Sequence, residues 1–299
     1  MDEAKWLEER RKGIGGSDIA AIMGLSPWKT AYQVYQEKRK EVGEWEGNTA
    51  TDWGRRLEPA IRQWYSDQTG RSVKLPDKIL YHKKYPFMLA SLDGFTDDRR
   101  IVEIKTSRIS KGWGDPGTNE IPDYYALQCQ HYMLVTGFEV TDVPVSIGGG
   151  SPELYEVPED KELQEMILDA ASGFWQRVID GNPPDVVTYA DAVQRYGLST
   201  ATGAVLAYED TIKEVLALKA LQVKAKEIET IYEEIKGRLI TFMGDSGDAI
   251  VDANANFLIT YKLAKGRTML DGKSLEKDMP EIYKKYLKTG EPSRRFLIK

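Results

Sequence analysis

Two acidic residues and a lysine stand at a spacing that suits hydrolytic chemistry. Asp93 and Glu103 are separated by nine residues, and Lys105 follows two positions after Glu103. The segment 101–105 is β-prone, and because successive side chains of a strand point to opposite faces, Glu103 and Lys105 would share one face. A polar turn at 97–100 would fold Asp93 back toward Glu103. We therefore predict that Asp93, Glu103 and Lys105 form one catalytic site.

The two carboxylates indicate a divalent cation. Two carboxylates held close together repel one another unless a cation or a shared proton resolves the conflict. Hard oxygen ligands suit Mg²⁺, with Mn²⁺ as a substitute. Lys105 could then orient or help to deprotonate an attacking water. The same residues also occur as an ordinary Asp-Gly turn and a solvated Glu-x-Lys pair, so the spacing alone leaves a structural role open.

Four further residues could contribute to the catalytic site or bind a phosphate. Glu58 lies at the edge of an apolar helical stripe and could face a cleft, or it could stabilise a helix dipole. Ser17 follows a glycine-rich segment at a predicted helix start, where a phosphate or a plain helix cap would fit. Gln128 is either a catalytic amide or a buried one. Arg10 lies among other basic residues and could be a solvated cation.

Several motifs together resemble a known family. Asp93, Glu103 and Lys105 resemble the PD-(D/E)XK nuclease signature. The flanking motifs resemble, in the same order, those of the YqaJ-type viral recombinase exonucleases, the phage lambda exonuclease family. They are Gly13–Ala20 with Ser26-Pro27-Trp28, Gly54–Pro59, and Ala126–Tyr132 followed by Val135-Thr136-Gly137.

The resemblance implies a fold and an activity. The fold would be a restriction-endonuclease-like α/β core, with a central mixed sheet flanked by helices. The activity would be that of a phage or prophage exonuclease that degrades one strand of linear duplex DNA from 5′ to 3′. The remaining 3′ single strand would serve a partner annealing recombinase, and the enzyme would be a homo-oligomer, a trimer by resemblance.

The resemblance also implies the metal ligands. Asp93, Glu103 and the backbone carbonyl oxygen of Ile104 would hold Mg²⁺, and Glu58 would reach a second ion or its waters. Two-metal hydrolysis needs ions ~4 Å apart, one beside the nucleophile and one beside the leaving oxygen.

The remaining roles concern the lysine and the phosphates. Lys105 would orient the water, and Gln128, together with Gln130, would hold that lysine or the scissile phosphate. Arg10 and Ser17 match the positions that bind the terminal 5′-phosphate.

Two other functions stay open on the residues alone. A structure-specific or nicking endonuclease could use the same catalytic residues. A non-catalytic DNA-binding assembly module could use the acidic middle of the chain and its long helix for protein partners. Cys129 is the only cysteine, which excludes an internal disulfide and a cysteine-ligated cluster and favours the reducing cytoplasm of a bacterial host.

Charge is distributed unevenly along the 299 residues, whose net charge is −6. Residues 1–111 contain 21 basic and 17 acidic residues, whereas residues 112–200 contain 3 and 15. The N-terminal third could therefore present a basic face to phosphates despite the acidic total. Apolar runs are shorter than the ~20 residues that span a bilayer, so we expect no membrane association.

The elements that must position these residues follow from apolar periodicity. It predicts helices over 2–12, 19–23, 30–38, 54–69, 123–136 and 161–179, with strands near 72–73, 79–81, 88–92, 101–105, 143–147 and 154–157. Composition changes after the proline pair at 183–184, and a long amphipathic helix is expected within 204–243. We therefore predict an exonuclease core over 1–200 and a mostly helical region over 201–299 with short strands, for oligomer, partner or DNA contacts.

Overall fold

A computed structural model describes residues 3–42, 48–290 and 292–298. The chain divides into two compact units, Met1–Arg195 and Tyr196–Lys299. This division falls slightly before the boundary expected after residue 200. Whether residues 201–299 act as a separate domain stays a prediction.

The first unit is built on a six-stranded mixed sheet. Its strand order is β2-β5-β6-β8-β7, and β9 pairs with the remaining edge of β8. The strands are β2 (Val73–Lys74), β5 (Gly94–Thr96), β6 (Arg100–Val102), β7 (Lys105–Ser107), β8 (Val140–Ile147) and β9 (Glu153–Pro158). The first part of β8 pairs parallel with β6, its last part pairs parallel with β7, and β9 pairs with it antiparallel. The long strand β8 therefore holds both short strands that flank Glu103.

A smaller sheet joins the N-terminal segment to the core. Its order is β1 (Ile14–Gly15), β4 (Met88–Ala90) and β3 (Leu80–Tyr81). Strand β1 pairs parallel with β4, with Ile14 opposite Met88. This pairing holds the glycine-rich segment against buried chain, because the residues of β4 are all buried.

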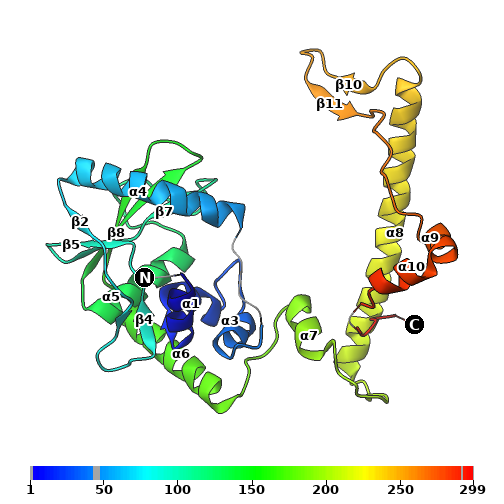
Figure 1. Cartoon of the computed structure of the whole chain (residues 1–299). Coiled ribbons are helices and arrows are strands. Elements are labelled where there is room, and N and C mark those ends of the chain that lie inside the picture. Colours follow the sequence, from blue (N-terminus) through cyan, green and yellow to red (C-terminus); the bar gives the residue numbers. More distant parts are fainter. Residues whose placement is uncertain (1–2, 43–47, 291, 299) are drawn as a thin grey trace. The chain divides into compact units, whose positions relative to one another are not determined.

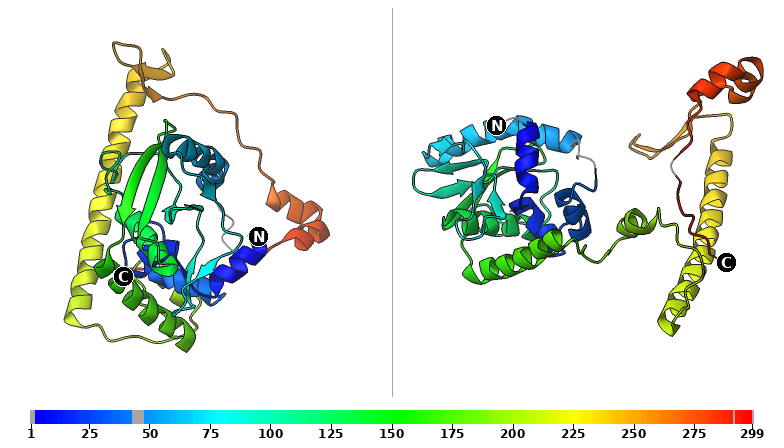
Figure 2. Two further views of the ribbon diagram at one scale, coloured as in Figure 1. Left: turned by 90° about the vertical axis from the view of Figure 1, so that its left-hand side faces the viewer. Right: turned by 60° about the horizontal axis from the view of Figure 1, so that its bottom comes forward.

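Helices cover both faces of the large sheet (Figures 1 and 2). Helix α4 (Thr49–Thr69) packs its Ile61 and Tyr65 on Val102 and Ile104. Helices α2 (Gly16–Ile22), α5 (Asp123–Thr136) and α6 (Lys161–Asp180) contribute to the larger core on the other face. The remaining helices of this unit are α1 (Glu3–Arg11), α3 (Ala31–Lys38) and α7 (Tyr189–Tyr196).

Helix α4 begins earlier than predicted. The sequence suggested a start near Gly54, but the helix begins at Thr49 because Asn48 caps it, accepting hydrogen bonds from the amides of Ala50 and Thr51. Pro59 consequently lies inside the helix rather than in its first turn. Glu58 is therefore too far from the helix N-terminus for the dipole role considered above.

The second unit is mostly helical. It contains the 35-residue helix α8 (Glu209–Met243), a hairpin of β10 (Ala249–Val251) and β11 (Phe257–Thr260), and the short helices α9 (Gly272–Asp278) and α10 (Pro280–Tyr286). The predicted fold class is confirmed: a mixed sheet flanked by helices is followed by a mostly helical region with short strands. Among the described residues, no helix combines the length and apolar composition needed to cross a bilayer.

His131 gives the first unit a pH-dependent stability. Its ring is fully buried, and Nε2 lies 2.8 Å from the carbonyl oxygen of Leu89, which can only accept, so Nε2 carries the proton. Burial lowers the pKa of His131 from 6.5 to about 4, although the Leu89 carbonyl acts in the opposite direction. The folded pKa lies below the unfolded one, so the unfolded chain takes up the proton as pH falls from 6.5 toward 4.

The stability that neutral His131 contributes is therefore complete above pH 6.5 and is lost below it. Between about pH 7.5 and about pH 5, this loss should reach ~2 kcal/mol. Urea unfolding at both pH values should show a smaller pH dependence for His131→Gln than for the wild type. Equal dependence in the two proteins would contradict this role for His131.

Candidate active site

Glu103 lies at an interruption between two strands. β6 ends at Val102 and β7 begins at Lys105, yet the backbone stays anchored because the amide of Glu103 donates to the carbonyl of Asp142 at 2.9 Å. The alternation predicted from sequence is retained: Val102 and Ile104 pack toward α4, while Lys105 Nζ donates to Glu103 Oε1 at 2.5 Å. Both charged side chains are almost entirely buried.

Asp93 reaches the same place from the other side of the hairpin. Strands β5 and β6 pair antiparallel with Gly94 opposite Val102. The Asp93 carboxylate accepts a hydrogen bond from the Ile104 amide at 2.9 Å. The structure thus brings together Asp93, Glu103 and Lys105.

Gln128 connects the lysine with the glutamate. On α5, its Oε1 accepts from Lys105 Nζ at 3.2 Å and its Nε2 donates to Glu103 Oε1 at 2.7 Å. The same Nε2 lies 3.2 Å from the hydroxyl oxygen of Tyr132. These contacts identify the buried amide of Gln128 as part of the candidate site.

Burial sets the protonation of the three charged groups. Burial, followed by the Glu103 carboxylate, raises the pKa of Asp93 well above its ordinary value. Burial also raises the pKa of Glu103, although Lys105 opposes that shift. Burial alone would lower the pKa of Lys105, but the Glu103 and Asp93 carboxylates outweigh it and raise that pKa. The lysine is therefore cationic, whereas the raised pKa of Asp93 favours a proton on that carboxyl group as long as no cation neutralises the pair.

One oxygen of the site is left without a partner. Glu103 Oε2 is buried and has no hydrogen bond, whereas Oε1 accepts from both Lys105 and Gln128. A buried carboxylate oxygen without a donor is costly unless a cation or water engages it. Asp93 and Glu103 supply the hard oxygen donors that Mg²⁺ prefers, so the residues fit a divalent cation.

The third predicted carboxylate is turned elsewhere. Glu58 forms an ion pair with Arg62 one helical turn away. Within the described ranges, no group of three or more His, Cys, Asp or Glu residues is arranged to hold a metal. Glu58 still acts on the site through space, because its charge contributes to raising the pKa of both Asp93 and Glu103.

The predicted phosphate-binding pair lies on the N-terminal segment. An Arg10 guanidinium nitrogen donates to Ser17 Oγ at 2.7 Å, and the guanidinium stacks over the Trp6 ring. Next to Ser17, Gly16 approaches α5 so closely that an added Cβ would lie 2.6 Å from the Tyr132 ring and 2.9 Å from the Gln128 side chain. The segment that carries Arg10 and Ser17 is therefore packed directly on the helix that contributes Gln128.

A buried ion pair that was not predicted from sequence holds this segment. Asp18 accepts from Lys38 Nζ at 2.7 Å and from the Gly15 amide at 3.0 Å, and Lys38 also donates to the Arg10 carbonyl at 2.9 Å. Burial alone would raise the pKa of Asp18, but the cations Lys38 and Arg10 outweigh it and hold that pKa well below its ordinary value. No sequence pattern predicts this pair, because nothing in the spacing links Asp18 to Lys38.

Gln130 does not agree with its predicted role at the phosphate. Its side chain is buried, donates to the Pro158 carbonyl and accepts from the Asp160 amide and from Gln164. Two positions along a helix lie on different sides of it, so Gln130 faces α6 while Gln128 faces the lysine. Gln130 fixes the junction of β9 and α6.

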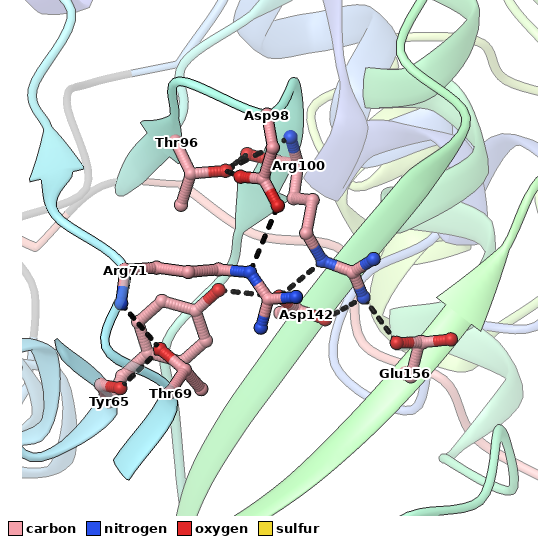
Figure 3. Close-up of polar contacts among 8 residues, drawn as sticks. All are labelled: Tyr65, Thr69, Arg71, Thr96, Asp98, Arg100, Asp142 and Glu156. Carbon is pink, nitrogen blue, oxygen red and sulfur yellow. Dashed lines mark hydrogen bonds and ion pairs between the residues drawn. The ribbon is translucent and has the colours of Figure 1, made fainter. Parts of the chain in front are cut away.

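A second polar network fixes the opposite face of the sheet (Figure 3). Arg100 donates to both carboxylate oxygens of Asp142, at 2.7 and 2.6 Å, and also pairs with Glu156. The Tyr65 hydroxyl donates to the same carboxylate at 2.5 Å. This network attaches α4 to β6 and β8, and the hydrophobic pattern gave no signal for it because its members are scattered polar residues.

Aromatic side chains border the lysine. Lys105 Nζ lies 4.7 Å from the ring centroid of Tyr125, and Trp28 packs against both Tyr124 and Tyr125. Trp28 is itself 67% exposed.

Comparisons with known proteins agree with the motif pattern. The model of the YqaJ-like viral recombinase domain matches residues 5–139. The YqaJ protein of Bacillus subtilis (strain 168) is 31% identical over an aligned 318 residues, which covers 100% of this chain and 95% of that protein. Protein D345L of African swine fever virus is 25% identical over 169 residues, covering 48% of this chain and 46% of the viral protein.

A solved structure shares the fold. The alkaline exonuclease LHK-Exo of Laribacter hongkongensis superposes with a TM-score of 0.50 and 21% identity, covering 60% of this chain and 94% of that enzyme. The same enzyme has also been solved in complex with dAMP.

Metal addition should change the stability of this site. In EDTA, Asp93→Asn should be at least as stable as the wild type, because one of two buried, mutually repelling carboxylates is removed. With Mg²⁺ at ~100 times its Kd, the wild type should gain about 2.7 kcal/mol. The variant should gain much less in the same urea titrations.

The matched control is Asp97→Asn, which changes an exposed carboxylate on the same hairpin. It should respond to Mg²⁺ as the wild type does. An undiminished Mg²⁺ response in Asp93→Asn would remove the metal assignment.

Proposed function

The chain belongs to the YqaJ-like viral recombinase family, and from that membership we propose that it is a Mg²⁺-dependent exonuclease acting on the ends of duplex DNA. The observation that carries this proposal is the buried cluster of Asp93, Glu103, Lys105 and Gln128 with one carboxylate oxygen left unpaired. Such a cluster costs free energy to bury, and the strongly shifted pKa values of its buried groups favour a catalytic purpose.

Asp93 and Glu103 would hold the cation, together with the backbone carbonyl of Ile104. When bound, Mg²⁺ supplies a nucleophile at neutral pH and stabilises charge on the phosphoryl oxygens. A second ion would require Glu58 to leave Arg62. The Glu58 side chain is 32% exposed, so burial does not lock it in that ion pair.

Lys105 would orient the attacking water and stabilise negative charge at the phosphate. Its ammonium group is fixed by Glu103 on one side and Gln128 on the other, so it enters the reaction already positioned. Gln128 is therefore a positioning residue for Lys105. The raised pKa of Lys105 favours a donor of hydrogen bonds over a general base.

Arg10 and Ser17 would bind a terminal 5′-phosphate. The guanidinium offers further donors beyond the one given to Ser17, and the serine hydroxyl is exposed. A fixed phosphate next to the segment that packs on Gln128 would set the length of the product. Digestion would then run 5′ to 3′ and leave a 3′ single strand for an annealing recombinase in the bacterial host.

Activity should depend on a DNA end and on Lys105. In Mg²⁺, the wild type should digest linear duplex DNA and leave covalently closed circles intact. Lys105→Ala should lose at least about 100-fold in rate, since the water and phosphate lose their positioned cation. Release of labelled nucleotides from linear duplexes and from closed circles measures the dependence on a DNA end. The same release from linear duplexes gives the rate of Lys105→Ala relative to the wild type.

Lys111→Ala is the control, because it removes an exposed lysine shortly after β7 and should leave the rate unchanged. Cutting of closed circles would favour the endonuclease alternative. Full activity of folded Lys105→Ala would refute the assigned site.

Arg10→Gln should weaken the preference for 5′-phosphorylated ends. The ratio of rates on 5′-phosphate and 5′-hydroxyl duplexes should fall roughly tenfold, because a charge-assisted hydrogen bond is lost. Rates on 5′-hydroxyl ends should stay close to wild type, and Arg11→Gln should retain the wild-type ratio. An unchanged ratio in Arg10→Gln would place the phosphate elsewhere.

A further inference from the structure

Three aromatic rings form a series that leads from the protein surface to the catalytic lysine. The Trp28 ring centroid lies 4.7 Å from that of Tyr124, with the two rings nearly perpendicular, and 6.1 Å from that of Tyr125. Lys105 Nζ lies 4.7 Å from the Tyr125 centroid. The two tyrosines are half-buried, whereas Trp28 is largely open to solvent. The proposed hydrolysis uses the lysine but gives no role to the exposed ring at the other end of the series.

The loop that carries Trp28 is held by its own hydrogen bonds. The Ser26 hydroxyl accepts from the backbone amides of Trp28 and Lys29, each at 3.2 Å. Pro27 restricts the backbone between them, and Thr30 caps the helix that follows. A large apolar ring is therefore presented to solvent on a hydrogen-bonded loop. A flat ligand could bind this ring without paying the entropy of ordering the loop first.

The place of Trp28 along α5 indicates which ligand it meets. The start of α2, at Gly16, approaches the Gln128 side chain on α5, and the loop after the end of α2 brings Trp28 to Tyr125. Lys105 lies between these two contacts, because its ammonium group is close to both Gln128 and Tyr125. The proposed 5′-phosphate site adjoins Gly16. That site, the lysine and Trp28 therefore follow one another along α5.

This order matches successive parts of one DNA strand. In a strand that runs from the proposed 5′-phosphate site past the lysine, the first nucleotide lies between the terminal and the scissile phosphates. Positions 125 and 128 are one helical turn apart or slightly less, about 4.5 Å along the axis. Successive nucleotides of a duplex strand advance by ~3.4 Å, which is a similar distance. The base that reaches Trp28 is then that of the second nucleotide.

We propose that Trp28 stacks on the base of the second nucleotide of the digested strand, which becomes the new 5′ end after each cleavage. This inference rests on the proposed exonuclease function. Aromatic side chains stack on every base, because each base has a π-face. Trp28 would thus hold the strand in register without selecting a sequence, as repeated digestion requires. The continuity of the rings with Lys105 favours DNA over a protein as the ligand of Trp28.

Removing either the ring or the base tests the stacking. The substrate is a 5′-phosphorylated duplex, with or without an abasic second nucleotide, at a concentration below KM in Mg²⁺. Release of the labelled first nucleotide by the wild type should slow roughly tenfold on the abasic duplex, because one stacked base is lost. Trp28→Ala should be roughly tenfold slower on the intact duplex and lose nothing further on the abasic one. Trp28→Phe should restore both the rate and the abasic effect.

Tyr189→Ala is the matched control, because it removes another largely exposed aromatic ring, on α7 and outside the series. It should keep the wild-type rate and the wild-type abasic effect. An equal abasic effect in the wild type and Trp28→Ala would overturn the proposal. So would a Trp28-dependent effect at the first nucleotide only, or a Trp28→Ala defect confined to binding of another protein.

Photocross-linking tests the same contact without cleavage. In EDTA, a duplex with 5-iodouracil at the second nucleotide should give, after irradiation, an adduct that mass spectrometry maps to Trp28. The same base in the middle of the duplex should give no adduct at Trp28. Adducts of the second nucleotide that map only to other residues would contradict the stacking.

The two measurements separate this inference from the proposed function. Cross-linking needs no metal and no hydrolysis, so it reports on Trp28 even if the chain digests nothing. Conversely, Mg²⁺-dependent digestion with the same abasic effect in Trp28→Ala as in the wild type would leave the nuclease proposal standing and remove only the role of Trp28.

Discussion

The first unit is organised around the burial of two carboxylates beside a single ammonium group. Taking ions out of water costs several kcal/mol for each, and the cost is offset only where geometry satisfies the remaining oxygens and protons. The Ile104 amide donates to Asp93 and the Gln128 amide donates to Glu103 Oε1, but Glu103 Oε2 has no hydrogen-bond donor. The fold therefore buries two carboxyl groups whose ionised forms repel one another, and a bound cation would stabilise both of them in the ionised form. The break between β6 and β7, the β5–β6 hairpin and the N-terminal half of α5 hold these two groups beside Lys105 and Gln128.

The N-terminal segment uses the same physics for another purpose. Asp18 and Lys38 form a buried pair of opposite charge, which leaves no net charge to be neutralised by a ligand. The hydrogen bonds of Asp18 and Lys38 join the end of α1, the start of α2 and the end of α3. The Asp18–Lys38 pair thus holds the residues that would meet the DNA end, whereas the cluster at Glu103 keeps one carboxylate oxygen without a hydrogen bond. This contrast fits a supporting role for the ion pair and the proposed metal-binding role for the cluster.

Local patterns predicted the parts of this structure that depend on nearby residues. The spacing of Asp93, Glu103 and Lys105 implied a hairpin, and apolar periodicity predicted the helix α5 that carries Gln128. The start of α4 was misplaced because Asn48, a strong cap, follows a polar segment without apolar rhythm. Long-range polar pairs could not be predicted, since the residues of the Asp142 network and the Asp18–Lys38 pair are far apart in sequence and share no period. Gln130 was misassigned because a repeated residue type in a motif does not reveal which side of the helix faces the site.

Asp142 makes contacts in two directions at once. Its backbone carbonyl receives the Glu103 amide on the strand itself, while its carboxylate is held by Tyr65 and Arg100 on the α4 side. Asp142 therefore ties the strand position of Glu103 to α4, which is also the helix that carries Glu58. The two acidic residues come from separate layers of the fold, and this single aspartate connects those layers.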